Sequence, residues 1–183
     1  MVIWKCHFKG DRLKNYKIED IMNLISDIEY GYMDKNNNIH YEIDNLFSNN
    51  YILESPDEVI KNKIGVCWDQ VELERYYFLN TDLNIKTYFM VYYDNDKCPT
   101  HTFLQFYKNN KYYWFEHAFT KYIGIHEYAS EKELLLDVKS KFIESINDYN
   151  DSNLVIYNYE KPNYHITVSE FYKHCESGIK IIL

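Results

Sequence analysis

Three consecutive segments in the second half of the chain combine aromatic and β-branched residues in the way that β-strands do. They are residues 86–94 (KTYFMVYYD), 101–108 (HTFLQFYK) and 111–119 (KYYWFEHAF). Only Asn109 and Asn110 separate the last two segments, and a two-residue turn of this kind is typical of a β-hairpin. The sequence therefore predicts an antiparallel sheet, and the turn sets the register of its last two strands.

The first half of the chain instead predicts helices. Apolar residues recur at helical spacing over residues 17–31, which indicates a first helix. Ser55, Pro56 and Glu58 form a capping-box pattern with proline at the first helical position, and this predicts a second, short helix. A third helix is predicted over residues 67–79, where the sequence again follows a mostly helical pattern.

The C-terminal third continues with mixed elements. Ser130 opens another capping-box pattern before a helix, residues 154–159 have the composition of a strand, and Thr167 caps a last short helix. Helices that precede an antiparallel sheet indicate the α+β class. Because no repeat or linker divides the sequence, we expect a single domain over residues 1–183.

Charge and cysteine spacing exclude several kinds of site and partner. The formal net charge is −8 and no run of Lys or Arg occurs, so we expect no nucleic-acid partner. No apolar leader or apolar stretch of about 18 residues is present, which predicts a cytoplasmic protein without a membrane span. Cys6, Cys67, Cys98 and Cys175 form no CxxC pair, so we expect free thiols, no metal site and no cofactor.

Cys67 stands at the predicted start of a helix, two residues after Gly65. Free N–H groups and the helix dipole stabilise a thiolate at such a position, and the thiolate is the nucleophilic form of cysteine. The glycine lets the backbone turn sharply or approach a substrate, and the N–H of Cys67 is a candidate donor to an oxyanion. A buried cysteine with a purely structural role is the alternative interpretation.

The predicted hairpin places an acid close to a histidine. Its register puts Glu116 diagonally across from His101, at about 7 to 8 Å between Cα atoms, which a glutamate side chain spans. Gln105 and Trp114 share the same sheet face by strand alternation. We expect the helix that begins at Cys67 to pack on this face, so that a nucleophile, a base and an orienting carboxylate meet.

Two stretches resemble motifs of the transglutaminase-like superfamily. GVCWDQVELERYYF (residues 65–78) resembles its nucleophile helix, which Gly-x-Cys opens, and HTFLQFYKNNKYYWFEHAF (residues 101–119) resembles its second motif. In that motif a histidine starts one strand, and an acid follows a tryptophan on the next. The family's acid is usually Asp, commonly followed by Pro, whereas this chain has Glu116 followed by His117.

The resemblance implies a papain-like core and thiol chemistry at an amide or ester bond. It implies that Cys67 is the nucleophile, that His101 moves the proton and that Glu116 orients His101. Family members also use a further oxyanion donor. Residues near the motifs that are candidates for this role or for substrate binding are Trp68, Gln70, Gln105 and Trp114.

Two functions remain open on the sequence. One is a thiol enzyme acting on a peptide or protein, and microbial relatives in the superfamily favour a hydrolase over an acyl transferase. The other is a catalytically inactive domain that holds a peptide or protein partner in an aromatic groove. The sequence leaves the oligomeric state open.

Overall fold

A computed structural model of the chain describes residues 17–94, 98–144 and 146–183. Cys6, which we expected to be a free thiol, lies outside these ranges. The helices are α1 (Ile18–Ile25), α2 (Phe47–Asn50), α3 (Pro56–Asn62), α4 (Cys67–Phe78), α5 (Glu131–Ile143), α6 (Val168–Glu176) and the 3-10 turns Thr120–Tyr122 and Asp151–Asn153. The strands are β1 (Glu29–Tyr30), β2 (Tyr32–Met33), β3 (Ile39–His40), β4 (Ile64–Gly65), β5 (Asn84–Tyr92), β6 (Thr100–Lys108), β7 (Lys111–Glu116), β8 (Gly124–Tyr128), β9 (Leu154–Tyr159) and β10 (Ile179–Ile181).

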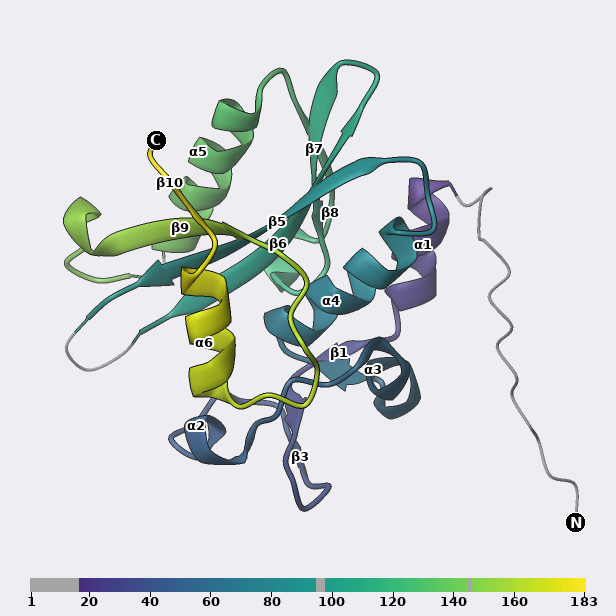
Figure 1. The fold of residues 1–183 in the computed structure, drawn as a ribbon, viewed down its shortest axis with the longest axis vertical. Helices are drawn as coiled ribbons and strands as arrows, with labels where there is room; N and C mark the ends of the chain where they lie inside the picture. The colour runs from purple at the N-terminus through teal and green to yellow at the C-terminus, as the bar shows by residue number, and fades with distance from the viewer. Residues whose placement is uncertain (1–16, 95–97, 145) are drawn as a thin grey trace, which may run out of the picture.

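Six strands form the central antiparallel sheet, in the order β10-β9-β5-β6-β7-β8. With helices on both sides of this sheet, the chain has a mixed α and β architecture consistent with the α+β class. In Figure 1, α4 and α6 lie on one side of the strands and α5 on the other, in agreement with the two separate clusters of buried residues. None of the helices in the described ranges is both long and apolar enough to cross a membrane.

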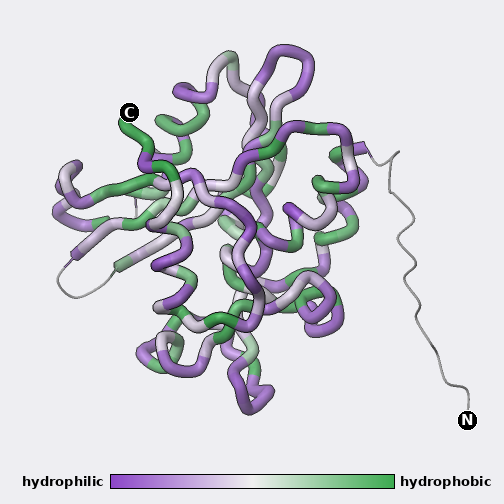
Figure 2. Tube along the Cα trace, in the orientation of Figure 1, coloured by the Kyte–Doolittle hydropathy of each residue, from purple (hydrophilic) through white to green (hydrophobic). Residues whose placement is uncertain are grey.

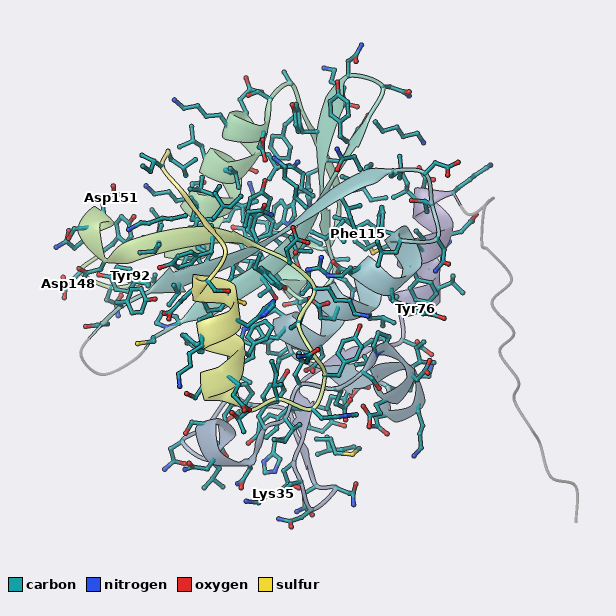
Figure 3. The ribbon with its side chains drawn as sticks, viewed as in Figure 1. Lys35, Tyr76, Tyr92, Phe115, Asp148 and Asp151 are labelled. Carbon is teal, nitrogen blue, oxygen red and sulfur yellow. The ribbon has the colours of Figure 1, made fainter. Side chains whose placement is uncertain are left out.

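The two sheet faces have separate cores. On the α4 face, Phe78 stacks on Phe106 with ring centroids 5.3 Å apart and meets Phe115 edge-on at 5.1 Å. Figure 3 shows Phe115 in the region between the sheet and α4. On the other face, Phe103 and Trp114 pack with apolar residues of α5. Figure 2 shows that most peripheral loops are hydrophilic. The buried apolar residues of the two cores hold the sheet between its helices.

Local turn and cap chemistry agrees with the sequence-based predictions. Ser55 caps α3, where its backbone N–H and hydroxyl donate to the Glu58 carboxylate at 2.8 and 2.6 Å. Ser130 caps α5 in the predicted position. Asn109 and Asn110 both adopt left-handed backbone angles, with φ of 51° and 60°, as a tight hairpin turn between β6 and β7 requires. The predicted register is confirmed by the pairs from Leu104–Phe115 to Lys108–Lys111.

The predicted first helix over residues 17–31 is too long. Helix α1 ends at Ile25, and Glu29–Tyr30 instead forms strand β1, which pairs in parallel with Ile64–Gly65 of β4. Helical spacing of apolar residues did not distinguish a short helix followed by a strand from one continuous helix, because Ile28 is buried in either case. This pairing brings Tyr30 beside the segment that leads into α4.

Candidate active site

Cys67 is the first residue of α4, as the sequence predicts. The Asp69 carboxylate closes the helix end by accepting hydrogen bonds from the Val66 backbone N–H at 3.0 Å and the Tyr51 hydroxyl at 2.7 Å. Within the described ranges, the backbone N–H of Cys67 donates to no other residue. The thiol therefore lies at the positive end of a helix, next to a free N–H group.

His101 and Glu116 form a direct contact. Nε2 of His101 lies 2.8 Å from Oε2 of Glu116, and both residues are buried. The carboxylate also accepts hydrogen bonds from the Trp114 indole N–H at 3.0 Å and from the Phe119 backbone N–H at 2.6 Å. Three donors thus fix the carboxylate, and the glutamate side chain is long enough to reach the imidazole.

The Cys67 thiol interacts with the His101 imidazole and contributes to its raised pKa. Because Nε2 is engaged by Glu116, Nδ1 is the ring nitrogen available to the sulfur. Burial by itself lowers the pKa of His101, but the charge of Glu116 and the interaction with Cys67 outweigh it and raise that pKa to about 10. The imidazole is therefore protonated at neutral pH, and a positive charge lies beside the sulfur.

Helix α4 does not pack on the sheet face that we expected. It covers the face of Leu104 and Phe106, whereas Gln105 and Trp114 point to the opposite face. Cys67 nevertheless interacts with His101. The last backbone pair between β6 and β7 is that of Leu104 with Phe115. His101 precedes Leu104 on β6 and has no backbone partner on β7.

The candidate substrate or oxyanion residues are buried and already engaged. The Trp68 indole N–H donates to the Thr100 hydroxyl at 3.1 Å. The Gln70 amide donates to the Gly65 carbonyl at 2.7 Å, and its oxygen lies 2.7 Å from Nδ1 of His117. Both side chains therefore hold structure around the start of α4.

The remaining two candidates lie on the α5 side of the sheet. Gln105 lines a surface pocket of about 210 Å³ together with Tyr107 and Tyr112, and neither Cys67 nor His101 lines that pocket. Trp114 is fully buried and contacts the Glu116 carboxylate rather than an open cleft. Its position makes it a support for the acid.

Tyr30 is a site residue that the sequence did not indicate. Its backbone pairs with Gly65, two residues before Cys67. Burial, together with the charge of Cys67, raises the pKa of Tyr30, so the phenol keeps its proton. No sequence signal was available, because the residue falls within the predicted helix of residues 17–31 and acquires its position only by pairing with β4.

Glu74 is a second residue near the site that the sequence analysis missed. It follows Cys67 by two helical turns on α4, is 3% exposed, and one carboxyl oxygen has no hydrogen-bond partner in the described ranges. Burial raises the pKa of Glu74 well above its usual value, and the charge of Glu116 adds to the effect. The spacing of seven residues from Cys67 was the signal that could have identified it.

The described residues contain no group of three or more His, Cys, Asp or Glu side chains arranged to hold a metal ion. Cys175 and Cys98 are free thiols, the first buried and the second exposed. Cys67, His101 and Glu116 bring a thiol, an imidazole and a carboxylate together, and all three residues are buried.

The sequence was also compared with known proteins and protein families. No curated protein matches the sequence. The family described as a transglutaminase-like domain matches residues 6–149, a span that includes α4 and the β6–β7 hairpin. Since the match covers more than half of the chain, the protein belongs to the transglutaminase-like domain family.

Proposed function

We propose that the protein is a cysteine-dependent enzyme that transfers the acyl group of an amide or ester bond through a thioester on Cys67. The observation that supports this most strongly is the 2.8 Å contact between buried His101 and Glu116, next to a thiol at the start of α4. In the same proposal, α4, β6 and β7 form a papain-like core within a single domain, and the protein is cytoplasmic with free thiols.

The reaction begins with His101 protonated and Cys67 as thiolate. The sulfur attacks the carbonyl carbon, a C–S bond forms, and the π-electron pair moves to the carbonyl oxygen. When this intermediate collapses, the bond to the leaving nitrogen or oxygen breaks and the leaving group takes the proton from His101. The products of this half are a thioester on Cys67 and a neutral His101.

The second half restores the thiol group. Neutral His101 accepts a proton from water or from an amine as that molecule attacks the thioester carbon. The C–S bond then breaks, and Cys67 leaves as thiolate beside a protonated His101. Throughout both halves Glu116 holds the ring through Nε2 and stabilises its positive charge, so Nδ1 stays directed at the sulfur.

The substrate class that we propose is a peptide or protein, and hydrolysis is the favoured outcome. Activated esters test the chemistry before a natural substrate is known. With p-nitrophenyl acetate, we expect a burst of about one p-nitrophenolate per chain, because formation of an acyl-enzyme releases the phenolate before the thioester is resolved. The Cys67→Ala variant should lose the burst, and the exposed-thiol control Cys98→Ala should keep it.

Hydroxylamine then separates the two outcomes. If the thioester is open to amines, hydroxylamine intercepts it and yields acetohydroxamate, whereas a strict hydrolase yields acetate. If neither the burst nor faster alkylation of Cys67 is seen in the wild-type protein, the proposed enzyme is wrong. The non-catalytic peptide-binding domain would then be the better account of the fold.

A further inference from the structure

A surface pocket of about 210 Å³ lies on the side of the sheet that faces α5, whereas Cys67 belongs to the core on the other side. Residues of three neighbouring strands and the first residue of α5 line this pocket: Asn84, Lys86, Gln105, Tyr107, Tyr112 and Glu131. Backbone pairing puts the strand residues on one face, since Asn84 pairs with Tyr107 and Tyr107 pairs with Tyr112. The register of the sheet therefore sets the walls of the pocket.

Two tyrosine rings form one wall. The ring centroids of Tyr107 and Tyr112 are 5.0 Å apart, with 57° between the ring planes. The Tyr107 hydroxyl donates to Oδ1 of Asn110 at 3.0 Å, which ties this ring to the hairpin turn. Because Tyr107 is 38% exposed and its ring is held, it offers an apolar surface to a bound molecule at a small cost in conformational entropy.

The charges in the pocket are already paired. Lys86 and Glu131 are the two charged residues of the six, and Nζ of Lys86 lies 2.7 Å from Oε1 of Glu131. The Tyr88 hydroxyl donates a second hydrogen bond to the same carboxylate oxygen. A charged ligand would have to compete with this ion pair, whereas a neutral ligand can bind beside it. The pocket therefore favours a neutral molecule.

The remaining polar groups offer both donors and acceptors. Within the described ranges, the Asn84 amide and the Tyr112 hydroxyl have no hydrogen-bond partner. Gln105 is 2% exposed, and its side-chain oxygen accepts a long hydrogen bond of 3.4 Å from the Tyr88 hydroxyl. Amide and hydroxyl groups both donate and accept, as the hydroxyl groups of a ligand do. This lining suits a ligand that carries several hydroxyl groups.

We propose that this pocket binds one neutral hexose ring. The C–H face of the sugar packs on the Tyr107 and Tyr112 rings. Its hydroxyl groups form hydrogen bonds with the amides of Asn84 and Gln105 and with the ion pair beside them. Since the pocket is separate from the thiol, this inference does not rest on the proposed function.

Other classes of ligand fit this lining less well. A purely apolar molecule would bury the amides without partners, and each unpaired group weakens binding. A nucleotide or another phosphate-bearing molecule needs a cation, and the Lys86 ammonium is engaged by Glu131. A hexose combines an apolar C–H face with several hydroxyl groups and no charge.

Titration of ¹⁵N-labelled protein with glucose, galactose and mannose, followed by NMR, tests the proposal. At least one of the three sugars should bind with a Kd of about 1 mM, the scale for a small neutral ligand, and should shift the side-chain amide signals of Asn84 and Gln105. Glucuronate adds a carboxylate to the same kind of ring and finds no unpaired cation in the pocket. It should therefore bind at least about 10-fold more weakly.

Three variants locate the sugar. Asn84→Ala removes an amide from an exposed position, so the variant should fold and should bind about 5-fold more weakly. Tyr107→Ala removes one ring of the wall and should weaken binding by about 10-fold. The matched control Tyr76→Ala removes a tyrosine of α4 that is also 38% exposed, and it should leave the Kd unchanged.

Three results would overturn the proposal. The first is that none of the three sugars shifts any signal. The second is that Asn84→Ala and Tyr107→Ala bind the sugar as the wild-type protein does, since the sugar would then lie elsewhere. The third is that glucuronate binds more tightly than the neutral sugars, since the ligand would then be acidic. Each of these results leaves the proposed function of Cys67 standing, because the acylation burst is measured separately.

Discussion

The buried carboxyl of Glu74 predicts a pH-dependent change in stability on replacement by glutamine. Glutamine has the size of a protonated glutamic acid, so Glu74→Gln preserves the packing of α4 against the sheet. One oxygen of Glu74 has no hydrogen-bond partner in the described ranges. Burial raises the pKa of Glu74, and the negative charge of Glu116 raises it further. The folded protein therefore keeps Glu74 protonated at a pH where the unfolded chain ionises it.

The sign and size of the effect follow from proton linkage. A carboxyl whose folded pKa is raised contributes stability that is complete below its unfolded pKa of about 4.3 and is lost as pH rises towards the folded value. Each pH unit in this interval costs about 1.4 kcal/mol for one proton. If Glu74 remains protonated to pH 7, the free energy of unfolding of Glu74→Gln relative to wild type should rise by about 2.5 kcal/mol between pH 5 and pH 7.

Urea unfolding at pH 5, 6 and 7, followed by circular dichroism, measures this difference. Asp69 and Glu54, whose pKa values burial raises to about 7, also titrate in this range, but wild type and variant share them. The difference between the two proteins therefore isolates Glu74. Glu42→Gln, which replaces an exposed glutamate, is the control and should show no trend. A stability difference for Glu74→Gln that stays constant from pH 5 to 7 would refute the reasoning, since Glu74 would then be ionised in the folded protein.

Two further predictions concern the thiol and its partners. Limiting iodoacetamide at pH 6.5 should label Cys67 before the exposed Cys98 and before Cys175, because burial raises the pKa of the Cys175 thiol. Peptide mapping identifies the labelled residue. If Cys98 is labelled first, Cys67 is not an activated thiol. Glu116→Gln removes the anion that raises the pKa of His101, so fewer His101 rings are charged at pH 6 to 7 and alkylation of Cys67 should slow. In contrast, Glu116→Asp keeps the charge on a shorter side chain and should slow alkylation less. If alkylation of Glu116→Gln has the wild-type pH profile, the Glu116 carboxylate is not coupled to the site.

The sequence by itself determined the features that depend on neighbouring residues. The capping box at Ser55, the start of α4 at Cys67 and the Asn109–Asn110 turn are each specified by residues within a few positions. Because the turn fixes the register of β6 and β7, the approach of Glu116 to His101 was also predictable. The family resemblance rests on these same local patterns.

The tertiary structure decided what depends on residues far apart in the chain. Strand alternation shows which side chains share a sheet face, but not which face a helix covers. Here Phe78 anchors α4 on the face opposite to the one that Trp114 occupies. Likewise, Tyr30 lies beside the segment that leads into Cys67 only because β1 pairs with β4, whose Gly65 is 35 positions later. Such long-range pairing is decided by the burial and hydrogen bonding of the whole fold, which local propensity does not encode.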